Sequence, residues 1–219
     1  MRSLADYVAY DPRYSSSARH RRRPPQVAGR GPVVRLIASL IILGVKTRFR
    51  LKWSGELPAS AFIAVSRHDS YWDGVVACVL DPRIMPVVSR FWRRVPFVGW
   101  FLRSYGAIWT KDQAVANAID AVFAGRCPWI APFGFERRTP RSSPSPGAVQ
   151  IARGADCPLL VIQMKRIPAT PRRLLGRPEL HVTASEPFRL SADEPLRTLT
   201  IRLDVLRGDV SANDGLFDY

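Results

Sequence analysis

Residues 64–74 have the sequence AVSRHDSYWDG and mark a change from strand to helix around which the rest of the chain can be arranged. The apolar run from Ala61 to Val65 predicts a short buried strand, and Tyr71 to Leu80 predicts a helix. His68 therefore lies at a strand-to-helix corner, where a rigid support can present a side chain. Asp73 follows five residues later, so its carboxylate can reach one imidazole nitrogen and leave the other as a base near neutral pH.

The segment from Ser66 to Asp73 resembles the Asn-His-x-Ser-x-x-Asp block of the glycerolipid, or lysophosphatidate-type (1-acylglycerol-3-phosphate), acyltransferases. A histidine and an aspartate at this spacing also occur by chance, as a surface histidine beside an aspartate that caps a helix. The order of the neighbouring segments is what makes the resemblance specific.

The segments on either side of the histidine follow the order of that family. Arg48 to Trp53 alternates basic and apolar residues, which predicts a half-exposed strand, and Gly55 to Pro58 forms a turn similar to the family's lead-in. Ile84 to Val88 predicts a second buried strand. Residues 95–109, with Val-Pro-x-x-Gly-Trp and then Gly-Ala-Ile-Trp, resemble the second block.

The second block differs from the family at the position of a phosphate-binding arginine, where this chain has Lys111 and Asp112. The resemblance implies that Lys111 or Arg103 would compensate for that carboxylate if the substrate carries a phosphate. Residues 89–103 also mix aromatic residues with arginines. That composition is typical of a single-stranded nucleic-acid surface, of a membrane interface, or of an amphipathic helix with its aromatic residues packed inward.

The third and fourth blocks follow a predicted helix, Asp112 to Ala124, and a predicted strand, Pro128 to Ala131. Residues 132–140 resemble the family's Phe-Pro-Glu-Gly-x-Arg block, but Phe133 stands where the family has an acidic or amide residue. Gly134 with Arg137 and Arg138 could cradle a phosphate, because glycine admits a close backbone approach and arginine offers a bidentate fork. A predicted helix (147–155) and strand (157–162) follow, and Val161 replaces a family proline.

The composition indicates one basic domain. The chain has 219 residues, 47% of them hydrophobic, and a net charge of +15, so it can bury one core and attract polyanions such as nucleic acid, anionic lipid or coenzyme A. The three cysteines are far apart, which disfavours a disulfide framework or zinc site and fits a reducing compartment.

Three segments are expected along the chain. Residues 1–32 are a flexible basic N-terminal segment, residues 33–46 are an interfacial membrane helix, and residues 47–219 are the acyltransferase domain. The apolar run Leu36 to Val45 is too short to cross a bilayer and lacks a cleavage site after it; a plain core helix is the alternative. A strand at Leu180 to Ala184 and a helix at Asp193 to Leu206 complete the prediction, and His181 is expected to be a packed residue.

The expected fold is a single α/β domain with a mixed, mostly parallel central sheet flanked by helices, plus the N-terminal membrane-associated helix. The resemblance implies an O-acyltransferase that moves a fatty-acyl group from acyl-CoA or acyl carrier protein to a lipid hydroxyl. The implied acceptor is lysophosphatidate, in phospholipid biosynthesis at the cytoplasmic face of the cell membrane. No metal and no resident cofactor are expected, and the partners are membrane lipids and the acyl donor.

The resemblance also assigns roles. His68 would be the general base and Asp73 would hold its tautomer, with Ser70 as a substrate contact and oxyanion donors near Gly134. One alternative acceptor is a neutral glycolipid or carotenoid glycoside, because Asp112 could accept hydrogen bonds from hydroxyl groups. Another alternative is a non-catalytic basic protein that binds nucleic acid or membrane. A degenerate, non-catalytic member of the acyltransferase fold is a further alternative, which the presence of both His68 and Asp73 disfavours. Nucleic acid is not the expected partner. A serine hydrolase is disfavoured because no Gly-x-Ser-x-Gly elbow is present.

Overall fold

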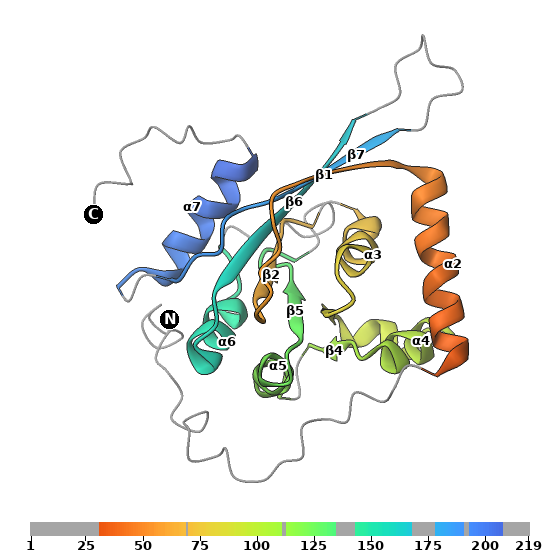
Figure 1. Ribbon diagram of the computed structural model, residues 1–219. Coiled ribbons are helices and arrows are strands. Elements are labelled where there is room, and N and C mark those ends of the chain that lie inside the picture. The colour runs from red at the N-terminus through yellow and green to blue at the C-terminus, as the bar shows by residue number, and fades with distance from the viewer. Residues whose placement is uncertain are drawn as a thin grey trace.

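The computed structural model describes residues 31–68, 70–110, 113–134, 143–167, 178–190 and 193–207. Within them, a seven-stranded sheet has helices on both faces (Figure 1). The strand order is β1-β7-β6-β2-β5-β3-β4. The strands are β1 (Arg50–Ser54), β2 (Ile63–Val65), β3 (Ile84–Val88), β4 (Ile108–Trp109), β5 (Cys127–Ile130), β6 (Leu159–Ile167) and β7 (Glu179–Ala184).

The strand pairs β6–β2, β2–β5, β5–β3 and β3–β4 are parallel, as is β1 with β7. Only β6 and β7 pair antiparallel in the described sheet. The mixed, mostly parallel sheet of the expected α/β domain is therefore confirmed. Each parallel crossover carries a helix, which covers a sheet that must be apolar on both faces.

The short central strand β2 shows how this sequence fills both faces. Ile63 and Val65 belong to a core cluster shared with α5 (Ala114–Phe123), α6 (Gly147–Ala155) and α7 (Pro195–Arg207). Ala64, which points the other way, belongs to a second cluster shared with α2 (Pro32–Arg48) and α3 (Tyr71–Leu80). The alternation of side chains along a strand thus divides the core between two faces.

The remaining helical segments complete the second face. The 3₁₀ helix η3 (Arg90–Arg94) and α4 (Val98–Tyr105) follow β3, and α4 contacts both η3 and α2. Figure 1 shows α4 beside the N-terminal end of α2. Helices α2, α3 and α4 therefore surround one side of the sheet, and α5, α6 and α7 lie on the other.

Several elements agree with the prediction, and others are longer. The helices at 71–80 and 147–155 and the strand at 84–88 have the expected bounds. Strand β6 continues to Ile167 rather than ending at Ile162, because its last residues pair with β7 and gain ladder hydrogen bonds that the local sequence does not reveal. Helix α2 begins at Pro32, which suits a first helical position, and runs to Arg48.

Helix α2 is also packed more closely on the domain than an independent surface helix would be. Val45 is fully buried and belongs to the second core cluster, and Val34 is buried as well. In the part of the chain that the structure describes, no helix is long and apolar enough to span a membrane. Most of the basic segment expected at 1–32 lies outside the described residues.

Candidate active site

The candidate site begins where two adjacent parallel strands end. Strands β2 and β5 pair in parallel, and the Ser66 N–H donates to the carbonyl of Ile130 at 3.1 Å. The chain segment after β2 carries His68, and the segment after β5 carries Gly134. Because parallel strands end at the same edge of a sheet, these two segments lie side by side, at the place where α/β proteins commonly bind ligands.

His68 and Asp73 form a close pair. The Nδ1 atom of His68 lies 3.2 Å from Oδ2 of Asp73, whose side chain is largely buried. The same Oδ2 accepts the backbone N–H of Ser70 at 2.8 Å, and the Ser70 hydroxyl accepts the N–H of Trp72. These contacts are a capping box at the start of α3, with Ser70 as N-cap. The pair is therefore built into the helix start.

The pair fixes how the imidazole is presented. Because Nδ1 faces a carboxylate, it carries the proton and donates, and Nε2 is left as an acceptor. The His68 ring meets the Trp129 ring edge to face, with centroids 5.5 Å apart and an interplanar angle of 90°. Gly74 lies against the same indole, and a Cβ atom at this position would lie 3.1 Å from the Trp129 ring. Trp129 was not foreseen from the sequence, where it was only one apolar position in a strand.

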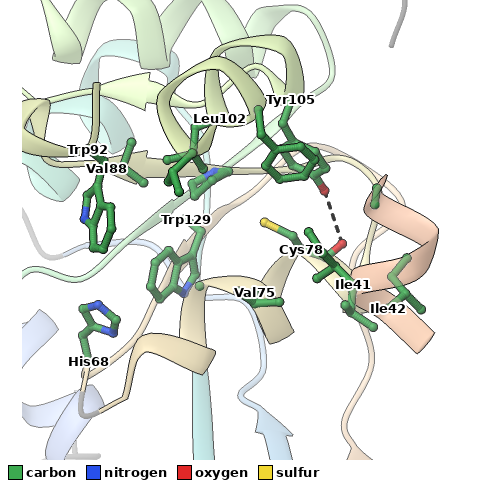
Figure 2. A pocket seen from close by; sticks show the side chains of 16 residues that line it. Ile41, Ile42, His68, Val75, Cys78, Val88, Trp92, Leu102, Tyr105 and Trp129 are labelled. Atoms are coloured by element: carbon green, nitrogen blue, oxygen red, sulfur yellow. Dashed lines mark hydrogen bonds between the residues drawn. The ribbon is translucent and has the colours of Figure 1, made fainter. Parts of the chain in front are cut away.

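His68 lies at one end of an apolar pocket with a volume of about 290 Å³. Figure 2 shows His68 near Trp92 and Trp129, with Tyr105, Ile41 and Ile42 at the other end. The Tyr105 hydroxyl donates to the carbonyl of Cys78 at 3.4 Å. The lining comes from α2, α3, β3, η3, α4 and β5 and consists of Ala38, Ile41, Ile42, His68, Gly74, Val75, Cys78, Val79, Pro86, Val88, Trp92, Val98, Phe101, Leu102, Tyr105 and Trp129. Its size is near the lower end for small-molecule pockets, about 300–1,000 Å³.

The pocket is suited to a hydrocarbon chain that ends beside a base. None of its described lining residues is a lysine, arginine, aspartate or glutamate. A long apolar chain can exchange water for these side chains at a gain of roughly 0.8 kcal/mol per methylene. The His68 imidazole at the end of the pocket then lies next to the chemical group that is attached to such a hydrocarbon chain.

Two departures from the family pattern meet beside the histidine. The Arg67 guanidinium carbon lies 3.9 Å from the centroid of the Phe133 ring. Arg67 also forms an ion pair with Asp204 on α7. Arg67 precedes the histidine where the resembled block has asparagine, and Phe133 stands where the resembled block has an acidic or amide residue, so the two unusual residues are in contact with each other. Neither Asp204 nor this contact was foreseen from the sequence, because 137 positions separate Arg67 from Asp204.

The other candidate residues lie in different parts of the chain. Ser70 is a helix cap, and Gly134 adopts a positive φ of 72° in the turn after β5, which glycine tolerates without strain. Arg103 is exposed on α4 and is not among the residues that line the pocket. Lys111, Asp112, Arg137 and Arg138 lie outside the described residues. His181 lies on β7 and contacts Glu179 at 3.0 Å.

The described residues contain no group of three or more histidine, cysteine, aspartate and glutamate side chains that could hold a metal ion. The three cysteines are free thiols. Burial raises the pKa of the Cys157 thiol to about 11 and also raises that of Cys127. Neither buried thiol is a thiolate near neutral pH.

Comparisons with known proteins bear on the family and on the fold. Residues 48–165 match the model of the family described as Acyltransferase. The fold is similar to the crystal structure of the 1-acyl-sn-glycerophosphate (LPA) acyltransferase PlsC from Thermotoga maritima. The TM-score is 0.59 at 19% sequence identity, covering 82% of this chain and 79% of that one. No curated protein sequence matches the chain. The matched segment is more than half of the chain and contains both His68 and Asp73.

Proposed function

The chain belongs to the acyltransferase family, and from this premise we propose that it moves a fatty-acyl group from an acyl thioester to a lipid hydroxyl. The observation that carries the proposal is the His68–Asp73 pair, 3.2 Å apart, at the end of an apolar pocket. The donor would be acyl-CoA or acyl carrier protein. The apolar pocket would hold a hydrocarbon chain, with the reacting carbonyl near His68.

His68 would act as general base in this reaction. Nε2 takes the proton of the acceptor hydroxyl as its oxygen attacks the thioester carbonyl carbon. The tetrahedral intermediate then collapses, the C–S bond breaks, and the imidazolium returns the proton to the leaving thiolate, giving an ester and a free thiol. A positioned base of this kind contributes about 10²- to 10⁴-fold. Asp73 stabilises the imidazolium, and backbone N–H groups of the Gly134 turn are the proposed donors to the oxyanion.

Lysophosphatidate is the first proposed acceptor, because the structurally similar protein from Thermotoga maritima is named as a 1-acyl-sn-glycerophosphate (LPA) acyltransferase. Arg137, Arg138 and Lys111 are the proposed phosphate ligands. One observation favours a second candidate, an uncharged lipid alcohol such as a glycolipid or carotenoid glycoside. The described pocket lining has no cation, and the Arg67 charge is already balanced by Asp204. A dianionic phosphate near His68 would therefore depend on residues 111 and 137–138.

Attachment to a membrane surface at the cytoplasmic face is also proposed, with α2 as one contact. Along α2, Val33, Leu36, Leu40 and Leu43 are each more than half exposed. Their spacing of three and four residues places them on one face of the helix. The opposite face supplies Ala38, Ile41 and Ile42 to the pocket. One apolar side of α2 thus packs on the protein, and the other apolar side is the one that would contact lipid.

The test offers a radiolabelled acyl donor, as CoA or acyl carrier protein thioester, to lysophosphatidate and a neutral glycolipid together. Wild type is compared with His68→Ala, and His181→Ala serves as the matched control on β7. We expect the product to be lost in the first variant by a factor of about 10² or more and kept in the second. Near-full activity of a folded His68→Ala variant would refute the mechanism, and the labelled product identifies the acceptor.

A further inference from the structure

The loop between η3 and α4 holds a phenylalanine in a strained conformation on the surface. Phe97 has φ 59° and ψ −50°, and the Val98 N–H donates to the Pro96 carbonyl at 2.6 Å, which is the pattern of a γ-turn with positive φ. Such turns are rare and strained for a residue with a side chain. Yet the Phe97 side chain is 85% exposed, so the strain is not offset by packing in the core.

Phe97 is one of several large apolar side chains exposed on this short segment. Phe91 on η3 is 64% exposed and Trp100 on α4 is 48% exposed. Phe97 directly precedes α4, and Trp100 lies on the first turn of that helix. Single exposed apolar residues are common on protein surfaces, but a group of aromatic residues on neighbouring turns marks a contact surface.

The charges on the segment point to an anionic partner. Four arginines with exposed side chains, Arg90, Arg93, Arg94 and Arg103, accompany the aromatic residues. The sequence has no acidic residue between Asp81 and Asp112. Aromatic residues together with arginines are typical of proteins that lie in the headgroup region of anionic lipid, where the rings enter the boundary and the cations stay with the phosphates.

The segment is also firmly supported. Gly99 packs so closely on η3 that a Cβ atom there would lie 2.6 Å from the Arg93 carbonyl oxygen, and its own N–H donates to the Val95 carbonyl. The inner side of α4 supplies Phe101, Leu102 and Tyr105 to the pocket that holds His68 (Figure 2). The aromatic tip is thus the outer side of a pocket wall.

We propose that residues 90–103, with Phe97 at the tip, form a second membrane contact that inserts into the interface of an anionic bilayer, in addition to the contact proposed for α2. The proposal needs no acyl transfer to be true. It differs from attachment through α2 because it assigns binding energy to a separate segment, more than forty residues further along the chain. An acidic protein or a nucleic acid could meet the same arginines, but the other side of α4 lines an apolar pocket suited to a hydrocarbon chain, which favours lipid as the partner.

The test measures cosedimentation of the full chain with vesicles of phosphatidylcholine alone or mixed with phosphatidylglycerol. Phe97→Ser is compared with Phe123→Ser, a matched control because Phe123 on α5 is 59% exposed on the other side of the sheet. We expect Phe97→Ser to weaken binding to the mixed vesicles by about tenfold or more and Phe123→Ser to leave it unchanged. Arg93→Gln with Arg94→Gln should weaken binding only when the anionic lipid is present, and added salt should reduce the difference.

The depth to which the segment enters the bilayer is measured separately, by quenching of Trp100 fluorescence with brominated lipid. The Trp100→Phe variant identifies the part of the fluorescence that comes from Trp100. Equal binding of Phe97→Ser and Phe123→Ser, or no Trp100 quenching, would overturn the proposal. So would an arginine effect that appears with an acidic protein or RNA but not with vesicles. Transfer to a monomeric short-chain acceptor by Phe97→Ser reports on the chemistry alone, so a failure of the acyltransferase proposal is distinguished from a failure of this one.

Discussion

Replacing Asp73 by asparagine or alanine separates the two tasks of one carboxylate oxygen. Oδ2 of Asp73 faces both the Nδ1 of His68, at 3.2 Å, and the N–H of Ser70, at 2.8 Å. Both partners donate, so an asparagine would turn its amide oxygen toward them and keep both contacts. Asp73→Asn therefore removes the charge and keeps the geometry, whereas Asp73→Ala removes both.

The magnitudes follow from these contacts. A hydrogen bond to a charged group contributes about 1 kcal/mol more than a neutral one. If that difference of about 1 kcal/mol is expressed in the imidazolium of the transition state, Asp73→Asn lowers kcat about fivefold, since about 1.4 kcal/mol is a factor of ten. Its stability should be nearly that of wild type. Asp73→Ala should also lose about 1 kcal/mol of helix capping, which for a chain of this size lowers Tm by about 2–4 °C.

The assay measures acyl transfer by a radiolabelled donor together with thermal unfolding of the same preparations. Glu179→Gln is the matched control, because the Glu179–His181 contact of 3.0 Å is a similar pair on β7, away from the pocket. Its transfer rate should equal that of wild type. If Asp73→Asn transfers as fast as wild type, Asp73 serves only as a cap. A loss as large as in His68→Ala would mean that Asp73 does more than stabilise and orient the imidazole.

Two further results are expected. Asp204→Asn should destabilise the fold by about 1–3 kcal/mol in urea unfolding, because the Arg67 guanidinium keeps its contact with the Phe133 ring but loses its carboxylate partner. The control is Asp156→Asn, which breaks the exposed ion pair with Arg189 and should change stability by less than about 0.5 kcal/mol; equal effects of the two substitutions would contradict a special role for the Arg67–Asp204 pair. The hydrogen bond from His181 and the contact with Lys52 lower the pKa of Glu179 from 4.5 to about 2. The contribution of Glu179 to stability is therefore full above about pH 4.5 and is lost as the pH falls toward 2. In urea unfolding from pH 2 to 6, Glu179→Gln should lose less stability on acidification than wild type, and identical pH profiles would contradict this.

The parts of the fold that the sequence predicted are those determined locally. Helix α3 could be placed because a serine and an aspartate three residues apart begin an apolar segment, and β3 because five apolar residues follow a Pro-Arg turn. The same local pattern placed His68 at its corner. The extension of β6 to Ile167 was not predictable, because residues 164–167 are increasingly exposed and are held in the strand by their partners on β7.

The parts of the site that were missed depend on contacts between distant positions. Asp204 is the single acidic residue of α7, and nothing in its neighbourhood in the sequence indicates that it meets Arg67. Phe133 was recognised as a departure from the family, but its ring becomes meaningful only when the Arg67 guanidinium lies on it. The sequence shows that Phe133 departs from the resembled block, and only the fold shows that the Arg67 guanidinium packs on its ring.

Most of the large apolar side chains that are exposed in the described residues belong to α2 or to the segment from η3 to α4, and these elements line one pocket. Leu36 and Leu40 could be polar without cost to the core, since the opposite side of α2 carries Val45 and the pocket-lining residues. Phe97 could be glycine, which would relieve its positive φ. Sequences are locally consistent except where function demands otherwise. Because α2 and α4 both line the pocket of His68, we propose one common cause for these exposed apolar residues, namely a lipid surface that is anionic outside, apolar inside and able to deliver a hydrocarbon chain.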